Sequence, residues 1–438
     1  MHVQRLTIEN IRSIRKLDLV LKRSETAGWH VLLGDNGSGK STVVRALALA
    51  LMGQSNAHAA RQDWSCWLSE DCDSGYVSAA LTAHDEDNWV GSGRKAKSPI
   101  LAKASIVAES AGGKRNERQA TIAFPDRHAR HAERTIWGGG YGWFSASFGP
   151  FRRFSGGDPA MERLFVTHPL LAPHLSAFGE NIALGESLLW LQDLEIKKLE
   201  KDEDAAEIQR SVIAFINEAE LLPHGAQIAN VSSEHVEIVD GHGSRVAVEE
   251  MSDGYRSILS LTFELMRLMF WAFGPDTVLD EIDTDARTIS LPGVVAIDEI
   301  DAHLHPAWQQ RIGDWFVARF PEMQFLVTTH SPIVCRAARR GSVWVLPAPD
   351  SDAEPRRIVG TELGRLVDGN VLDAYSTELF GEEVTRSEQS KEKLVRLARL
   401  NRKRLKRRLS VKEQRELEHL RTVMPSSPNT TAPVRPHS

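Results

Sequence analysis

The feature that most constrains the fold is the segment 34–41, which reads GDNGSGKS. It matches the pattern G-x-x-x-x-G-K-[ST], in which glycines let backbone N–H groups turn toward a phosphate. The apolar run WHVLLG precedes it and GKSTVVRALALALMG follows, so the segment joins a buried strand to a helix whose positive dipole end points at the same place. The sequence therefore predicts an α/β core with a phosphate-binding loop. The alternative is a glycine-rich turn that holds no ligand.

This loop predicts ATP as the ligand and Mg²⁺ as the cofactor. Lys40 is expected to reach the β- and γ-phosphates, and Ser41 to ligate Mg²⁺. The candidate ATP-binding residues of the loop are Gly34, Asp35, Asn36, Gly37, Ser38, Gly39, Lys40, Ser41 and Thr42.

A second segment, VVAIDE at 294–299, is an apolar strand that ends in two adjacent carboxylates. Neighbouring strand residues point to opposite faces, so the two carboxylates cannot share one role. Asp298 is predicted to hold Mg²⁺ through water, and Glu299 to lie beside the γ-phosphate and polarise the attacking water. The alternative is a strand that exits to solvent.

Two further segments have both a structural and a functional interpretation. In MSDGYRS at 251–257, Ser252 is a natural N-cap for a helix that runs from about Gly254 to Phe273. In FLVTTHSP at 325–332, His330 lies at the tip of a buried strand and could be an ordinary turn residue.

These four segments occur in the order of ABC-type ATPases, and together with IDEIDAHLHP they resemble the SMC/RecF/OLD branch of that superfamily, with an AAA-type P-loop core. Within it, the chain is similar to the stand-alone ATPases of bacterial anti-phage systems such as Septu and some retrons. The resemblance implies that Ser252 and Gly254 form a signature loop that contacts ATP bound to another subunit. It implies an H-loop histidine at His330 and a D-loop aspartate at Asp301, in a helix beginning at that residue. The implied catalytic residues are Glu299, His330 and Lys40.

The chain also departs from the pattern of the family. Residues 147–153, SFGPFRR, lie where a Q-loop is expected but contain no glutamine. Arg152 or Arg153 is the candidate substitute for the missing contact to Mg²⁺ and water. No long coiled coil separates the two halves of the motif set, so an SMC arm is not expected.

The expected fold is an α/β P-loop NTPase with an ABC-type core, an antiparallel β subdomain, an inserted helical lobe and a C-terminal helical appendage. The acidic segment 274–290 is interpreted as a solvated loop, with mimicry of nucleic acid or its repulsion from the ATP face as the alternatives. The expected divisions are 1–55 (first half of the core), 56–159 (β subdomain and Q-loop equivalent), 160–235 (helical lobe), 236–345 (second half of the core), 346–424 (helical appendage) and 425–438 (disordered tail).

The C-terminal helical segment carries leucines along one edge and a run of basic residues. This run is either the solvated face of an amphipathic helix or a site for nucleic-acid phosphates or an acidic partner. Ser410-Val411-Lys412-Glu413 is a capping box, which predicts a second short helix. The candidate phosphate-contacting residues are Arg396, Arg399, Arg402, Lys403, Arg404, Lys406, Arg407 and Arg408.

Composition narrows the functional classes. The formal net charge of −6 means that any nucleic acid must bind at a local patch. Three cysteines argue against a disulfide framework, no apolar run approaches the ~20 residues of a bilayer span, and no signal-peptide core begins the chain. A cytoplasmic location without a membrane span is therefore expected.

The resemblance implies an enzyme that converts ATP and water to ADP and phosphate as a homodimer or higher homo-oligomer. The first functional hypothesis is the regulatory or motor subunit of an anti-phage defence complex that controls a separate effector, such as an HNH-type nuclease. The alternative is a RecF/SMC-like DNA-repair ATPase that binds DNA directly. A transporter ATPase is disfavoured by the missing Q-loop glutamine.

Overall fold

The computed structural model describes residues 1–91, 99–109, 119–139, 141–349, 351, 353–369, 388–406 and 409–423. The chain forms two compact units, Met1–Gly369 and Asn370–Ser438, and each is described by itself.

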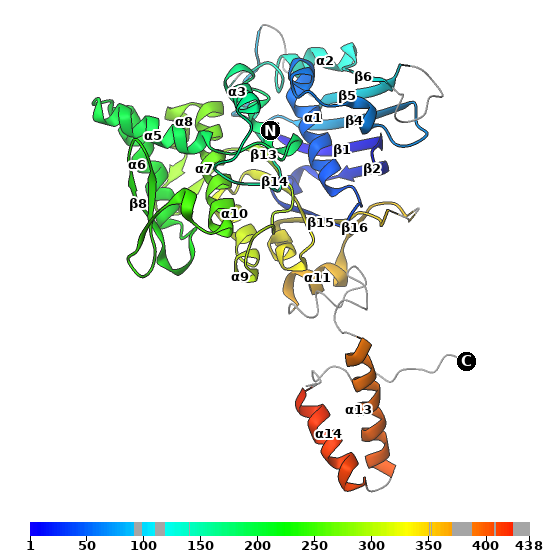
Figure 1. The fold of residues 1–438 in the computed structure, drawn as a ribbon. Helices are drawn as coiled ribbons and strands as arrows, with labels where there is room; N and C mark the ends of the chain where they lie inside the picture. Colours follow the sequence, from blue (N-terminus) through cyan, green and yellow to red (C-terminus); the bar gives the residue numbers. More distant parts are fainter. Residues whose placement is uncertain are drawn as a thin grey trace. The chain divides into compact units, whose positions relative to one another are not determined.

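A six-stranded sheet forms the centre of the first unit, with the order β16-β15-β3-β14-β13-β7 (Figure 1). Its strands pair in parallel except for the edge strand β16, which is antiparallel to β15. The carboxyl ends of parallel strands meet at one edge of a sheet, and ligands of open α/β sheets bind there. The strands are β3 (Gly28–Leu33), β7 (Ser145–Phe148), β13 (Gly293–Ile297), β14 (Met323–Thr329), β15 (Gly341–Val345) and β16 (Arg356–Ile358).

A second sheet is wholly antiparallel, with the order β2-β1-β4-β5-β6. It confirms the antiparallel β subdomain expected from the sequence, and β1 and β2 at the start of the chain join the same sheet. Along these strands buried and more exposed side chains alternate, as expected where one face packs and the other meets solvent. The strands are β1 (His2–Ile11), β2 (Ile14–Val20), β4 (Ser74–Thr82), β5 (Ile100–Ala108) and β6 (Ala120–Ala123).

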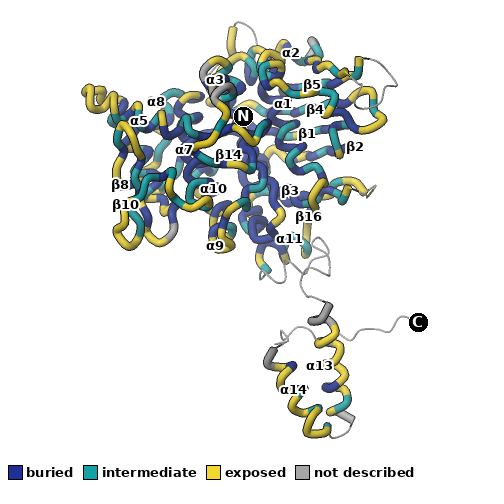
Figure 2. The backbone as a smooth tube through the Cα atoms, viewed as in Figure 1, coloured by how far each residue is buried: buried dark blue, intermediate teal, exposed yellow. Residues whose placement is uncertain are grey.

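Helix α1 (Lys40–Ala59) contacts both sheets, including β4 and β5 of one and β7 and β14 of the other. This position explains why its sequence is apolar on most sides, because most residues of the helix are buried (Figure 2). The backbone leaves helical geometry at Gly53, whose φ is +78° and where a Cβ would lie 2.7 Å from Cγ of Trp137. The Trp137 indole donates to the carbonyl of Ala50 at 3.0 Å across this break.

An aromatic cluster supports the central sheet and adjoining helices. Trp29 on β3 packs against Phe325 on β14 and against Phe316, which belongs to α10 (Ile312–Arg319). Phe316 in turn contacts Phe320, and all four rings are buried. Each ring removes a large apolar area from water, so this cluster fixes the strands that carry the candidate site.

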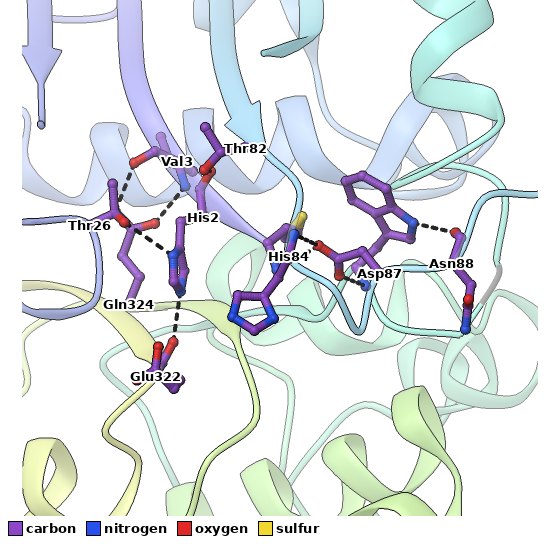
Figure 3. Close-up of polar contacts among 11 residues, drawn as sticks. His2, Val3, Thr26, Thr82, His84, Asp87, Asn88, Glu322 and Gln324 are labelled. Atoms are coloured by element: carbon purple, nitrogen blue, oxygen red, sulfur yellow. Dashed lines mark hydrogen bonds and ion pairs between the residues drawn. The ribbon is translucent and has the colours of Figure 1, made fainter. Parts of the chain in front are cut away.

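The start of β1 is bound to the start of β14 by polar contacts (Figure 3). Val3 and the side chain of Gln324 exchange two hydrogen bonds, of 2.6 and 2.8 Å, and His2 Nε2 donates to the carbonyl of Glu322 at 2.7 Å. The α-ammonium group of Met1 lies 2.9 Å from Asp87, and burial lowers the pKa of this amine. These contacts join the antiparallel sheet to the central sheet.

The helical lobe expected after residue 160 is present and includes α3 (Pro159–Thr167), α4 (Leu175–Phe178), α5 (Glu186–Leu199) and α6 (Glu203–Glu218). Helix α5 packs against α6 and against α7 (Asp253–Phe273). The bounds of α7 confirm the helix expected from about Gly254 to Phe273. The chain between α6 and α7 forms the small sheet β10-β9-β8, whose strands are β8 (Gln227–Val231), β9 (Val236–Val239) and β10 (Arg245–Ala247).

The segment 274–290 is largely exposed or half-buried, as the interpretation of a solvated insertion expects, but it is not a loop. Its residues form α8 (Pro275–Asp280) and a hairpin of β11 (Ile282–Asp283) and β12 (Thr288–Ile289). Val278 and Ile289 are fully buried, so their apolar side chains anchor a segment whose acidic composition suggested solvent.

The helical appendage begins later than expected. Residues 346–369, with β16 and α11 (Gly360–Asp368), belong to the first unit, because β16 pairs with β15 of the central sheet. The expected tail 425–438, together with Arg407 and Arg408, lies outside the described residues.

The second unit contains α13 (Glu388–Lys406) and α14 (Val411–Val423). Leu397 and Leu400 of α13 pack on Leu417 and Leu420 of α14, so the leucine edge is buried within this hairpin. The capping box is confirmed, because Glu413 N donates to Ser410 Oγ at 3.3 Å and Ser410 N donates to Glu413 Oε2 at 3.0 Å. Across the described part of the chain, no helix combines the length and the apolar character that crossing a membrane requires.

Candidate nucleotide site

The phosphate-binding loop joins the carboxyl end of β3 to the first turn of α1. Gly37 and Gly39 have φ values of +82° and +94°, in the left-handed region that glycine adopts without strain. At Gly39 a Cβ would also lie 2.8 Å from Ile14 Cγ1. The glycines are thus required both by the turn and by the close approach of the segment between β1 and β2.

Lys40 is held within this loop rather than extended into solvent. Its Nζ donates to the carbonyls of Gly34 at 2.8 Å and Asp35 at 2.9 Å, and the residue is 6% exposed. Burial lowers the pKa of the Lys40 ammonium, while the nearby carboxylates of Glu299 and Asp298 oppose this shift. Ser38 Oγ is buried without a hydrogen-bond partner among the described residues. The loop therefore presents a cation and an unused hydroxyl where the sequence predicts phosphates.

A cavity of about 1010 Å³ lies at this edge of the central sheet. It is lined by residues 36–42 of the loop, by Glu299 after β13 and by His330 after β14. Three segments that are far apart in the sequence thus meet around one space, because β3, β13 and β14 run in parallel and are neighbours. The structure brings together Lys40, Glu299 and His330, the three predicted catalytic residues.

Asp298 directly precedes Glu299 in the sequence and is 3% exposed. Thr328 on β14 donates from Oγ1 to Asp298 Oδ1 at 2.6 Å and accepts from the backbone N–H of Glu299 at 2.8 Å. Glu299 itself has a φ of +45°, which is uncommon for a residue with a side chain. One threonine hydroxyl therefore orients the carboxylate of Asp298 and the backbone of Glu299.

The two candidate substitutes for the Q-loop glutamine make different contacts. Arg152 is 4% exposed, and its guanidinium donates to the backbone carbonyls of Asp298 at 2.8 Å and Glu299 at 2.9 Å. Burial lowers the pKa of Arg152 to about 10. Arg153 donates to the carbonyls of Gly156 and Glu180. Arg152 thus contacts the backbone of the turn that carries Asp298 and Glu299. The sequence pattern did not indicate these contacts, because backbone carbonyls are the acceptors.

The signature-like residues are not brought to the cavity of their own chain. Ser252 is the N-cap of α7, but its exposed side chain makes no capping hydrogen bond. Neither Ser252 nor Gly254 lines the cavity. Gly254 instead faces the carbonyl of His303, which would lie 3.0 Å from an added Cβ.

The expectation that a helix begins at Asp301 is wrong. Residues 298–303 form turns, and α9 begins at Pro306 (Pro306–Gln309), capped by His305, whose Nδ1 accepts from Ala307 N at 3.3 Å. Proline favours the first helical position, which explains the later start. Asp301 Oδ1 is buried with no hydrogen-bond partner among the described residues.

The sequence interpretation missed two walls of the cavity. Residues 12–17, which form the turn after β1 and the start of β2, supply Arg12, Arg15 and Lys16, and residues 346–349 follow β15 with two prolines. The basic residues of segment 9–16, ENIRSIRK, could have indicated the first of these walls, since cations beside a phosphate-binding loop are expected to attract an anionic ligand.

Comparisons with known proteins give matches over parts of this chain. Residues 158–336 match the family described as "AAA domain, putative AbiEii toxin, Type IV TA system", and residues 5–99 match a family described as "AAA domain". The "Septu protein PtuA" of Bacillus mycoides (strain KBAB4) is 25% identical over 348 residues, 78% of this chain and 40% of that protein. The "Retron Ec83 probable ATPase" of Escherichia coli is 34% identical over 123 residues, 28% of this chain and 21% of that protein.

The chain therefore matches less than half the length of these relatives. Among solved structures, an SMC head bound to the C-terminal winged-helix domain of ScpA covers 82% of this chain at 15% identity, with a TM-score of 0.48, a similarity too low to bear on function. The chain is therefore similar, over parts of its length, to two AAA-domain families and to proteins named as Septu and retron ATPases, and the order of its motifs resembles that of ABC-type ATPases.

Proposed function

We propose that this chain binds ATP with Mg²⁺ and hydrolyses it to ADP and phosphate. The observation that carries the proposal is the convergence of Lys40, Glu299 and His330 on one cavity beside the phosphate-binding loop. Lys40 binds the β- and γ-phosphates, Glu299 polarises the attacking water, and His330 contacts the γ-phosphate. Phosphoryl transfer requires mainly positioning and charge stabilisation, which this set of residues can supply.

The residues present also fit Mg²⁺, which prefers oxygen ligands and keeps several waters. Ser41 opens α1 beside Lys40, and Asp298 lies buried at the end of β13 with one oxygen bound to Thr328. Ser41 would ligate the ion directly and Asp298 would hold it through water. When bound, the ion neutralises charge on the phosphates.

A second copy of the chain completes the site in this proposal. Ser252, Gly254 and Asp301 do not line the cavity of their own chain. The N-cap hydroxyl of Ser252 is exposed, and the buried Oδ1 of Asp301 has no hydrogen-bond partner among the described residues. A helix N-terminus favours an anion, so α7 of one protomer is suited to the γ-phosphate held by its partner. Binding and hydrolysis then close and open a dimer.

The cellular role that we propose is the regulatory or motor subunit of an anti-phage defence complex that controls a separate effector, such as an HNH-type nuclease. Similarity to the Septu and retron proteins supports it over a limited part of their length. The alternative, a DNA-repair ATPase, is supported by Arg399, Arg402 and Arg404, which are exposed on α13. Reversing these three charges should weaken one interaction in a salt-dependent way. Loss of the complex with an effector encoded by a neighbouring gene would support the defence role, and loss of DNA binding would support the repair role.

Hydrolysis is tested by measuring steady-state phosphate release from Glu299→Gln. Removing the group that polarises water should lower turnover by about 10²–10⁴-fold, while ATP binding by calorimetry stays unchanged. The matched control is Glu70→Gln, because Glu70 lines the same cavity without a proposed catalytic role. A Glu299→Gln variant with the turnover of the control would contradict the proposal.

A further inference from the structure

Arg152 is a buried cation whose partners are unusual. Its guanidinium makes hydrogen bonds to the carbonyls of Gly149, Asp298, Glu299 and Ile300 and to the hydroxyl of Ser257. No carboxylate oxygen forms an ion pair with it within the described residues. Burying a charge is costly unless hydrogen bonds replace its water, and here backbone carbonyls of an otherwise irregular segment do so.

Three of these carbonyls, those of Asp298, Glu299 and Ile300, are consecutive and belong to the turn that follows β13. The Arg152 N–H groups fix this turn on its carbonyl side, while Thr328 fixes the N–H of Glu299 on the other side. Glu299 has a positive φ, a conformation that persists only where surrounding contacts over-determine it. The orientation of the Glu299 side chain therefore depends on the hydrogen bonds that Arg152 and Thr328 make to this turn.

The remaining contact of Arg152 leads to the signature helix. Its Nε donates to Ser257 Oγ at 3.0 Å, and Ser257 is fully buried in α7, little more than one turn beyond Ser252. A helix moves as a rigid element over so short a distance. A displacement of the first turn of α7 would thus be transmitted to the turn at Glu299 by the side chain of Arg152.

We infer that Arg152 is a positioning residue that couples the signature end of α7 to Glu299, so that contact of α7 with the nucleotide of a partner protomer sets the catalytic glutamate in place. This inference rests on the proposed ATPase function. The adjacent Arg153 provides a matched comparison, because its guanidinium contacts Gly156 and Glu180 and not the turn.

The experiment measures kcat, KM and ATP affinity for Arg152→Lys, Ser257→Ala and the control Arg153→Ala. Lysine keeps the charge but cannot reproduce the planar fork, and Ser257→Ala removes only the link to α7. Both variants should lower kcat about tenfold or more, the effect of losing one hydrogen bond to a charged group, with KM and ATP affinity changed less than about threefold. Arg153→Ala should keep wild-type kinetics.

Chemical rescue separates positioning from folding. Millimolar guanidinium should restore part of the kcat of Arg152→Ala, whereas the same concentration of sodium chloride should not. If Ser257→Ala and Arg152→Lys both keep the wild-type kcat, or lose kcat only in proportion to their folded fraction, the inference is overturned. A wild-type chain without turnover would instead overturn the proposed function from which it starts.

Discussion

The N-termini of α1 and α7 are both suited to bind anions, but they differ in burial and in the contacts that their polar groups make. The first turn of α1 is enclosed by two sheets, and its Lys40 and neighbouring Ser38 are buried beside the cavity. At the start of α7, Ser252 and Asp253 are exposed, the next three residues are half-buried, and the N-cap hydroxyl is not used for capping. The phosphate-binding loop thus has its structural partners within its own chain, whereas the signature-like loop has unused donors that a second chain can engage.

The largest expected effect tests the enclosed end. Lys40→Ala should weaken ATP binding at least about tenfold, because a hydrogen bond from a charged group is worth about 1.5–3 kcal/mol, and turnover should be lost. Calorimetry with ATP and a phosphate-release assay measure the two effects. Lys197→Ala is the control, since Lys197 on α5 pairs with Asp193 and does not line the cavity. Unchanged ATP affinity in Lys40→Ala would remove the loop from nucleotide binding.

The second effect tests the open end. Ser252→Glu places a negative charge where the partner's γ-phosphate is expected, so ATP should still bind while ATP-dependent dimerisation and turnover fall at least about tenfold. Folding should be little affected, because the Ser252 side chain makes no capping hydrogen bond. Sedimentation with ATP and phosphate release measure the outcome. The same change at the exposed Ser55 of α1 is the control. Normal turnover in Ser252→Glu would mean that α7 does not meet nucleotide.

A mixture of the two inactive variants sharpens the comparison further. When Lys40→Ala pairs with Ser252→Glu, one of the two shared sites contains the intact loop of one protomer and the intact signature of the other. An equal mixture should therefore recover roughly a quarter of wild-type turnover, because half of the dimers are mixed and each has one intact site. An activity equal to the sum of the separate variants would show that each chain hydrolyses ATP alone.

The smallest expected effect concerns the second unit. The buried leucines of α13 and α14 pack on one another, so a chain ending at Gly369 should keep its fold and its turnover within about twofold. Circular dichroism and phosphate release measure this, and pull-down of the neighbouring gene product then tests whether the hairpin recruits it. Loss of turnover in the shortened chain would assign the hairpin to the ATPase.

Local pattern was sufficient for much of the fold and of the site. The loop 34–41, the strand that ends at Asp298 and the strand that ends at His330 each carry their own periodicity, and parallel strands bring their ends together. The helix expected to begin at Asp301 begins later because Pro306 favours the first helical position. The segment 274–290 is largely exposed or half-buried as expected, but it forms a helix and a hairpin whose Val278 and Ile289 are buried. In both places a local signal competed with a stronger constraint.

The sequence by itself determined the phosphate-binding chemistry, the order of the core elements and the identity of the residues at the strand ends, because glycine conformations and apolar periodicity act over short distances. Only the tertiary structure decided how the walls of the cavity are built and what Arg152 contacts. Its partners are backbone carbonyls, which every residue possesses, so no pattern of side chains could mark them. Burial selects those carbonyls, since a guanidinium removed from water must find acceptors wherever the packed chain provides them.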